Sequence, residues 1–420
     1  MLQVAVQRLQ AAWANAELYV ITSDAEGLAR FCPGTIPVPS SKMQWLTGGP
    51  LLPDRVAARM PRRLKEIEHN WERRMETSFP ETYERLCRLK RTLGSPASTS
   101  APVMSVLQVC DALVVSGMGG FTDVFEGNAL RMLRLLQLGL RLGKEVVLFG
   151  QGIGPIAPSS RLWVEAAATF PRVGRICLRE GVFGPDLLSA LRVDMSRVAV
   201  TGDDALELVA GTGTGGTGRG VIGVNLRVAS HSGIAREEAR MIGETLSRVA
   251  RAIGLRILPI PIALYRGASD EDALFGIPGV EDAARGASAI EPSTVIKRIG
   301  QADMVVTCSY HAAVFALGQG VPAIGLASNG YYRHKFYGIS GQFPGGCIVL
   351  DPRGPHFAEQ LRRAVELSMQ TRRLIGEGLR EQAARQVQDG RAAYSSAVQF
   401  IEDRVTRKAQ WAGTLADAAS

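Results

Sequence analysis

The stretch that decides the fold runs from Asp303 to Leu326 and reads DMVVTCSYHAAVFALGQGVPAIGL. An apolar segment ends at the polar residues 307–309, apolar residues then recur at helical spacing, and a second apolar segment closes the stretch. This order predicts strand, turn, helix, strand. In a parallel α/β sheet, ligands lie beyond the carboxyl ends of the strands, where a helix N-terminus favours anions. Because His311 follows the first strand there, we take it as the first candidate for catalysis.

Length and composition limit the class of protein. The chain has 420 residues, of which 46% are hydrophobic, and this is enough for two domains with separate cores. Its six cysteines are scattered singly, which favours neither a disulfide framework nor a zinc site. The first residues lack a signal-peptide pattern, and no apolar run approaches membrane-spanning length. These features predict a cytoplasmic protein, either free or peripheral to the membrane.

The charge of the chain favours anionic ligands. Its formal net charge is +8, but the basic residues are spread along the sequence and do not form a stripe interleaved with aromatic residues. Nucleic acid is therefore not an expected partner. No cluster of His, Asp and Glu has the spacing of metal ligands, so we expect no metal.

Four short apolar segments in the first half are each followed by a glycine-rich or polar turn. The segments are 112–115, 145–149, 175–178 and 198–200, and the turns begin SGMGGFTD, GQGIGP, RE and TGDD. This repetition predicts successive βα units of a parallel sheet. Such turns bring backbone N–H groups close to an anion, although neither glycine run is a complete dinucleotide or Walker A motif. The candidate anion-binding residues are Gly119, Gly120, Gly152, Gly154 and Arg179.

Two acidic features of these turns have structural interpretations. Glu180 could simply form an ion pair with its neighbour Arg179. Asp203 and Asp204 are predicted to be turn and N-cap residues, because Asp is favoured before a helix on backbone grounds.

The segment GTGTGGTGRG, residues 211–220, is the predicted domain boundary. So much glycine cannot form a core and is typical of a flexible linker. After it the βα pattern restarts at 221–226. We therefore predict an N-terminal α/β domain over 1–210, a C-terminal α/β domain over 221–353, and helices over 354–420 that pack back on the first domain.

Taken together, these motifs resemble the polysaccharide pyruvyl transferase family. The resemblance covers roughly residues 105–350 and is carried by SGMGGFTD, GQGIGPI, LRE, VTGDDAL, IGVNLR and HAAVFALGQGVPAIGL, in that order. It implies two Rossmann-like domains with parallel sheets, similar to the GT-B glycosyltransferases. It also implies transfer of a pyruvyl group from phosphoenolpyruvate to a sugar as a ketal, without a cofactor.

The candidate residues fit that chemistry. Phosphoenolpyruvate carries a phosphate and a carboxylate, which forked arginines bind well, and Arg179 and Arg227 follow strands of opposite domains. Lys335 resembles the basic residue that follows the histidine segment of the family. Pyruvyl transfer also needs proton transfers, which His311 can perform. Tyr331 and Tyr332 are either an acceptor-stacking surface or buried residues of the second domain.

The sequence departs from the family at one position. The family usually has Arg two residues before the histidine, where this chain has Ser309. Either that contact is missing or Arg333, His334 or Lys335 supplies it. A glycosyltransferase that uses a nucleotide sugar, and a redirected or non-catalytic sugar-binding protein, remain alternative functions. The acceptor can be a free sugar, a glycan or a lipid-linked sugar, and the sequence does not indicate an oligomeric state.

Overall fold

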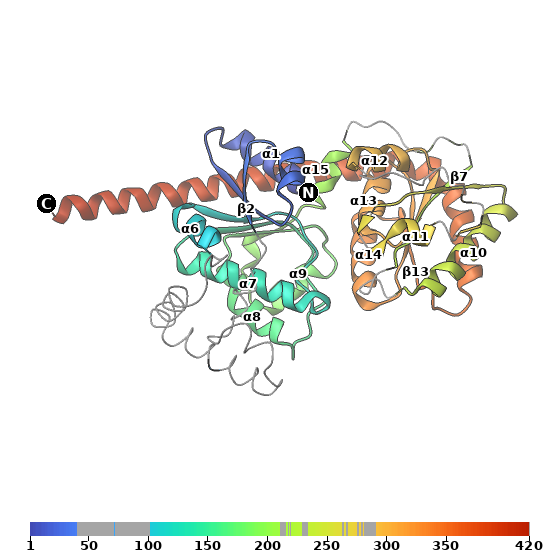
Figure 1. Ribbon diagram of the computed structural model, residues 1–420, viewed down its shortest axis with the longest axis horizontal. Helices are drawn as coiled ribbons and strands as arrows, with labels where there is room; N and C mark the ends of the chain where they lie inside the picture. Colours follow the sequence, from blue (N-terminus) through green and yellow to red (C-terminus); the bar gives the residue numbers. More distant parts are fainter. Residues whose placement is uncertain are drawn as a thin grey trace.

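The computed structural model contains two main parallel sheets, one in each half of the chain (Figure 1). It describes residues 1–39, 71, 101–210, 216, 218, 220–228, 234–262, 264–265, 268–274, 277–278, 280 and 291–419. The first sheet has the strand order β3-β4-β5-β6 and the second has the order β13-β12-β11-β7-β8. All neighbours in both sheets are parallel. The predicted fold class, two α/β units with parallel sheets, is confirmed.

The first sheet consists of the four strands expected from the sequence. They are β3 (Ala112–Val115), β4 (Glu145–Gln151), β5 (Arg175–Leu178) and β6 (Val198–Val200). Its helices are α6 (Ala101–Val109), α7 (Glu126–Arg141), α8 (Arg161–Thr169) and α9 (Gly184–Ala190). A small parallel sheet of β1 (Leu18–Thr22) and β2 (Thr35–Pro39) lies beside it with α1 (Leu2–Ala12) and α2 (Ala25–Phe31). Buried aromatic and aliphatic side chains such as Phe170 and Leu133 form the main core of this half.

The second sheet is built around the stretch that opened the sequence analysis. That stretch forms β11 (Met304–Thr307), α13 (Tyr310–Gly318) and β12 (Ala323–Leu326), as predicted. Every residue of both strands is buried, which explains why they read as continuous apolar runs. The other strands are β7 (Val221–Asn225), β8 (Arg256–Pro259) and β13 (Cys347–Leu350), with the hairpin β9 (Leu264–Tyr265) and β10 (Ala268–Ser269). The helices are α10 (Arg236–Ala252), α11 (Asp270–Leu274), α12 (Pro292–Ile299) and α14 (Gly330–Gln342).

The predicted linker, residues 211–220, lies mostly outside the described residues. Its described members Gly216, Gly218 and Gly220 have φ angles of 84°, 68° and 70°, which favour glycine. The carboxylate of Asp303 accepts hydrogen bonds from the N–H groups of Gly218 (2.6 Å) and Val221 (3.0 Å). Asp303 therefore fixes the chain where it enters β7.

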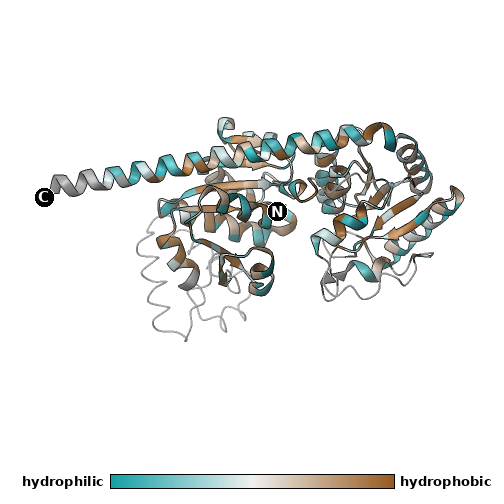
Figure 2. Cartoon of the chain, turned by 90° about the horizontal axis from the view of Figure 1, so that it is seen from above, coloured by the Kyte–Doolittle hydropathy of each residue, from teal (hydrophilic) through white to brown (hydrophobic). Residues whose placement is uncertain are grey.

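The C-terminal segment is one helix, where the sequence analysis predicted several. Helix α15 runs from Phe357 to Ala419 and contacts strands β11, β12 and β13 before it reaches β4, β5 and α1 of the first half. No proline follows residue 355, and Gly376 allows the helix to approach the carbonyl of Gly320 closely. The prediction of packing on the first domain is confirmed. Figures 1 and 2 show α15 extending past that domain toward the C-terminus.

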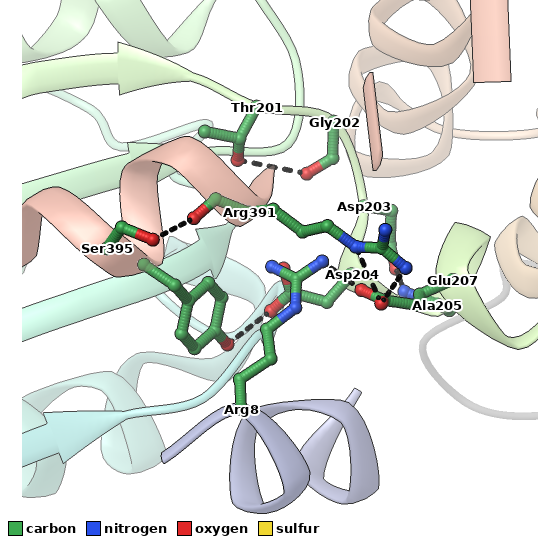
Figure 3. Close-up of polar contacts among 10 residues, drawn as sticks. Arg8, Thr201, Gly202, Asp203, Asp204, Ala205, Glu207, Arg391 and Ser395 are labelled. Atoms are coloured by element: carbon green, nitrogen blue, oxygen red, sulfur yellow. Dashed lines mark hydrogen bonds and ion pairs between the residues drawn. The ribbon is translucent and has the colours of Figure 1, made fainter. Parts of the chain in front are cut away.

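Both ends of the chain hold the segment between the two sheets (Figure 3). Arg8 of α1 and Arg391 of α15 pair with the two carboxylate oxygens of Glu207 in the 3-10 helix η5 (Asp204–Leu208), Arg391 at 2.7 Å. The hydroxyl of Tyr394 donates to Asp204 at 3.0 Å, and its ring stacks on Phe149. The connection from β6 toward β7 is therefore anchored to both terminal helices.

The buried carboxylate of Asp204 predicts a pH-dependent stability. Burial, followed by the charge of Asp203, raises its pKa from 3.8 to about 6, against the hydrogen bond from Tyr394. The folded state then binds a proton more tightly than the unfolded chain, so this group lowers stability as pH rises from about 4 to about 6. Asp204→Asn, which keeps an acceptor for Tyr394, should stabilise the protein at pH 8 by about 1 kcal/mol more than at pH 5. Urea unfolding at both pH values measures this, and an equal effect at the two pH values would contradict the assignment.

Candidate functional site

A small cavity lies between the two halves of the chain. The first half contributes Gly119, Gly152, Gly154, Arg179 and Glu180, and the second contributes Tyr310, Tyr331, His334 and Lys335. The cavity volume is about 10 Å³, which is room for about one water molecule. The hydroxyl of Tyr331 crosses the boundary and donates to the carbonyl of Gly119 at 3.0 Å. Of the candidate residues, the cavity lining includes Gly119, Gly152, Gly154, Arg179, Tyr331 and Lys335.

Arg179 is a buried cation at the end of β5. It is 4% exposed, its Nη1 lies 3.7 Å from Oδ2 of Asp203, and its guanidinium lies 4.1 Å from the ring centre of Tyr310. Glu180 has a different role, because its carboxylate accepts the N–H groups of residues 182, 183 and 184 at the start of α9. Asp203, as predicted, is an N-cap and accepts the N–H of Ala205. The suggested pair of Arg179 with Glu180 is therefore replaced by a pair with Asp203.

Two of the predicted glycines make room for Arg179. A Cβ atom at Gly119 would lie 2.5 Å from Nη2 of Arg179, and one at Gly152 would lie 2.6 Å from its Nε. Only glycine permits this approach without displacing the guanidinium. Gly154, with φ of 98°, lies beside the ring of His334, whereas Gly120 contacts Met118 and does not line the cavity.

Lys335 brings a second cation to the cavity from the first turns of α14. Its Nζ lies 4.1 Å from the ring centre of Tyr331 and 5.6 Å from that of Tyr332. Within the described ranges it forms no ion pair with a carboxylate. Burial lowers its pKa well below the ordinary lysine value, and the charges of Arg179 and Arg227 lower it further. An anion bound here would relieve that unfavourable accumulation of positive charge.

His311 lies next to the cavity, in contact with a residue of its wall. Its ring meets the ring of Tyr310 edge to face at 5.6 Å, and its Nε2 is buried without a hydrogen-bond partner in the described structure. Burial lowers the pKa of His311 to about 4, and Arg179 and Lys335 act in the same direction against Asp203. The imidazole is therefore neutral near pH 7 and can accept a proton.

Arg227 is paired with a carboxylate, and Tyr331 and Tyr332 are buried. Arg227 forms a bidentate ion pair with Asp270, at 2.9 Å and 3.3 Å, and does not line the cavity. Tyr331 and Tyr332 are each 4% exposed, and burial raises the pKa of both hydroxyls. Both tyrosines are therefore buried in this structure, and Tyr331 lines the cavity.

The structure also places the residues around the sequence departure at Ser309. Ser309 is 3% exposed at the N-cap of α13, and its N–H donates to the hydroxyl of Thr307 at 2.8 Å. Arg333 pairs with Asp351 on the surface at 3.1 Å. His334 and Lys335 are therefore the members of the nearby basic segment that reach the cavity.

Sequence reasoning gave His334 too little weight and did not select Tyr310. His334 stacks on Phe183 with ring centres 4.2 Å apart, and its Nε2 lies 4.0 Å from Oε1 of Glu180. The available signal was position, because His334 precedes Lys335 at the start of a helix. Its carboxylate partner comes from the other half of the chain and could not be paired with it in advance.

The family follows from a match of sequence. The model of the family described as Polysaccharide pyruvyl transferase matches residues 1–330 of the chain. The chain belongs to the polysaccharide pyruvyl transferase family. It is therefore a transferase, and the family implies a sugar or glycan as acceptor. None of the curated proteins matches the chain.

Solved structures of other enzymes share the fold. LpCGTa in complex with UDP is 14% identical with a TM-score of 0.54, and covers 95% of this chain and 96% of its own. UDP-GlcNAc 2-epimerase from Neisseria meningitidis bound to UDP-GlcNAc is 11% identical with a TM-score of 0.53, and covers 96% of each chain. UDP-glucose: anthocyanidin 3-O-glucosyltransferase in complex with UDP is 12% identical with a TM-score of 0.51, and covers 96% of this chain and 95% of its own. These likenesses establish the GT-B-like fold of the pyruvyl transferase chain.

The described residues lack the usual features of a membrane span and of a metal site. Among the described residues, no helix combines the length and the apolar character that crossing a membrane requires. The same residues contain no group of three His, Cys, Asp or Glu side chains that could hold a metal ion.

Proposed function

We propose that this transferase moves a pyruvyl group from phosphoenolpyruvate to two hydroxyl groups of a sugar, where it forms a ketal. The observation that carries the proposal is the pair of cations, Arg179 and Lys335, that the two halves of the chain bring to one cavity. Lys335 has no carboxylate partner in the described part of the chain, and it lies close enough to Arg179 for the two charges to interact. A small ligand with both a phosphate and a carboxylate would compensate these charges.

The reaction balances without an oxidant or a cofactor. Two bonds form between C2 of phosphoenolpyruvate and the sugar oxygens, the bond from C2 to the phosphate oxygen breaks, and the methylene carbon gains a proton to become a methyl group. The two protons that the hydroxyl groups lose balance the proton that this carbon gains and the proton on the released phosphate. The protein therefore has to bind a highly charged donor, remove protons from hydroxyl groups and deliver one proton to carbon.

Three residues in or beside the cavity could perform these tasks. Arg179, held by Asp203 and Tyr310, is a preorganised fork for the carboxylate or phosphate of the donor. Lys335 supplies the charge that the family arginine would supply at Ser309. Neutral His311, with its unpaired Nε2, is suited to accept a proton from an acceptor hydroxyl.

Binding of this donor requires the two halves of the chain to separate. A cavity of about 10 Å³ has room for one water molecule and not for phosphoenolpyruvate. The hydrogen bond from Tyr331 to the carbonyl of Gly119 must then open. Substrate entry in this account is a small domain movement around the segment anchored by Glu207.

Lys335 should be required for donor binding. Lys335→Met is expected to weaken phosphoenolpyruvate binding at least about tenfold, because it removes a partly buried cation that would contact a highly charged ligand. Binding to the parent should also weaken as salt rises from about 50 mM to about 300 mM. Calorimetric titration measures both effects, with Lys297→Met on the exposed face of α12 as the matched control. Unchanged affinity in Lys335→Met would show that another residue compensates for Ser309.

A thermal-shift comparison tests the proposed donor against a nucleotide sugar. A ligand that binds only the folded state raises the unfolding midpoint with its concentration. We expect phosphoenolpyruvate to raise the midpoint and UDP-glucose to leave it unchanged. A shift with UDP-glucose and none with phosphoenolpyruvate would move the assignment to glycosyl transfer.

A further inference from the structure

His334 lines the cavity, but it has no part in the roles proposed for Arg179, Lys335 and His311. Its Nε2 is buried without a hydrogen-bond partner in the described structure, and its ring belongs to the cavity wall. Stacking on Phe183 across the boundary fixes the plane of the ring. A partly buried, oriented imidazole whose Nε2 has no hydrogen-bond partner among the described residues is a group prepared to exchange a proton with a ligand.

Glu180 places a carboxylate near the ring of His334. Oε1 of Glu180 lies 4.0 Å from Nε2 of His334. Three backbone N–H groups at the start of α9 hold the carboxylate in place. The acidic group that acts on His311 is Asp203, which is already paired with Arg179.

Three charged residues, Glu180, Arg179 and Lys335, act on the pKa of His334. Burial first, and then the cations Arg179 and Lys335, lower its pKa, whereas Glu180 and the backbone of Ile153 raise it. A polyanion bound to the two cations would cancel their effect and leave that of Glu180. Donor binding and protonation of the ring should therefore favour each other.

We propose that His334 takes up a proton at Nε2 when phosphoenolpyruvate binds Arg179 and Lys335, and holds it beside Glu180 for delivery to the methylene carbon of the donor. This inference rests on the proposed pyruvyl transfer. It divides the proton transfers between two histidines, with His311 accepting a proton from the acceptor and His334 supplying one to the donor. The carbon–hydrogen bond forms with the electrons of the enol double bond, and the ring returns to its neutral form.

Proton uptake on donor binding tests the inference without an acceptor. Phosphoenolpyruvate is titrated into the full-length protein at pH 7.5 in two buffers of different ionisation enthalpy, such as HEPES and Tris. The difference between the two heats gives the number of protons bound with the ligand. We expect an uptake of about one proton in the parent and close to none in His334→Gln.

Three further variants make the test specific. His334→Phe keeps the stack on Phe183 and removes both ring nitrogens, so it should also lose the uptake even if His334→Gln folds poorly. His311→Gln should keep the uptake. His356→Asn is the matched control, because His356 is exposed and has a φ of 60°, a conformation that Asn tolerates.

Each outcome has one interpretation. Loss of uptake in both His334 variants, with uptake kept in His311→Gln, supports the inference. Uptake that survives in the His334 variants, or that is lost in His311→Gln alone, overturns it and leaves the donor assignment standing. Binding to the parent without any uptake also overturns the inference alone, whereas no binding of phosphoenolpyruvate to the parent overturns the proposed function together with it.

Discussion

His311→Gln is expected to lower the rate of pyruvyl transfer by about 10² to 10⁴, the range found when a general acid or base is removed. The neutral ring beside Tyr310 has a free Nε2 in the described structure, and among the described histidines His334 lines the cavity itself. The measurement is the rate of phosphate release from phosphoenolpyruvate in the presence of a sugar acceptor.

The same variant should fold and bind the donor. Because Nε2 has no partner within the described chain, its removal leaves no buried group newly unpaired, and the free energy of unfolding should change by about 1 kcal/mol or less. A parent-like transfer rate would exclude His311 from the chemistry. A large loss of stability would show instead that the ring is part of the packing of α13.

Gly152→Ala should weaken phosphoenolpyruvate binding by about 10- to 100-fold. The new Cβ would lie 2.6 Å from both Nε and Nη2 of Arg179, so the guanidinium has to move away from Asp203 and Tyr310. Loss of a positioned fork for a carboxylate or phosphate costs about 2 kcal/mol or more. Calorimetric titration of the variant with phosphoenolpyruvate measures the loss.

Gly181→Ala is the matched control for this substitution. The nearest atoms to its Cβ would be the two Cγ atoms of Val200, at 3.5 Å and 3.7 Å, and Oε1 of Gln342, at 4.0 Å. These are ordinary van der Waals contacts. We expect its affinity for the donor to equal that of the parent. If Gly152→Ala also binds like the parent, Arg179 is not a ligand of the donor.

The fold could be predicted because its signals are local. In the stretch from Asp303 to Leu326, the apolar runs and the polar break at 307–309 determine β11, α13 and β12 within a few residues. The length of α15 was not predictable in the same way, since Gly376, Gly378 and Gly390 favour breaks. Packing of the helix across both sheets outweighs that local preference.

The candidate site could be predicted where a strand end or the family resemblance indicated a residue. Arg179 follows a strand end, Lys335 resembles a basic residue of the family, and both line the cavity. Arg227 follows one too, but Asp270, 43 residues along the chain, pairs with it. The contact of His334 with Glu180 joins opposite halves of the chain, and no local pattern shows such a pair.

The structure of a co-crystal with phosphoenolpyruvate tests the central claim most directly. The account predicts that the donor lies between Arg179 of the first half and Lys335 of the second, with the halves moved apart and the bond from Tyr331 to Gly119 broken. Phosphoenolpyruvate bound elsewhere on the chain, with this cavity still closed, would contradict it.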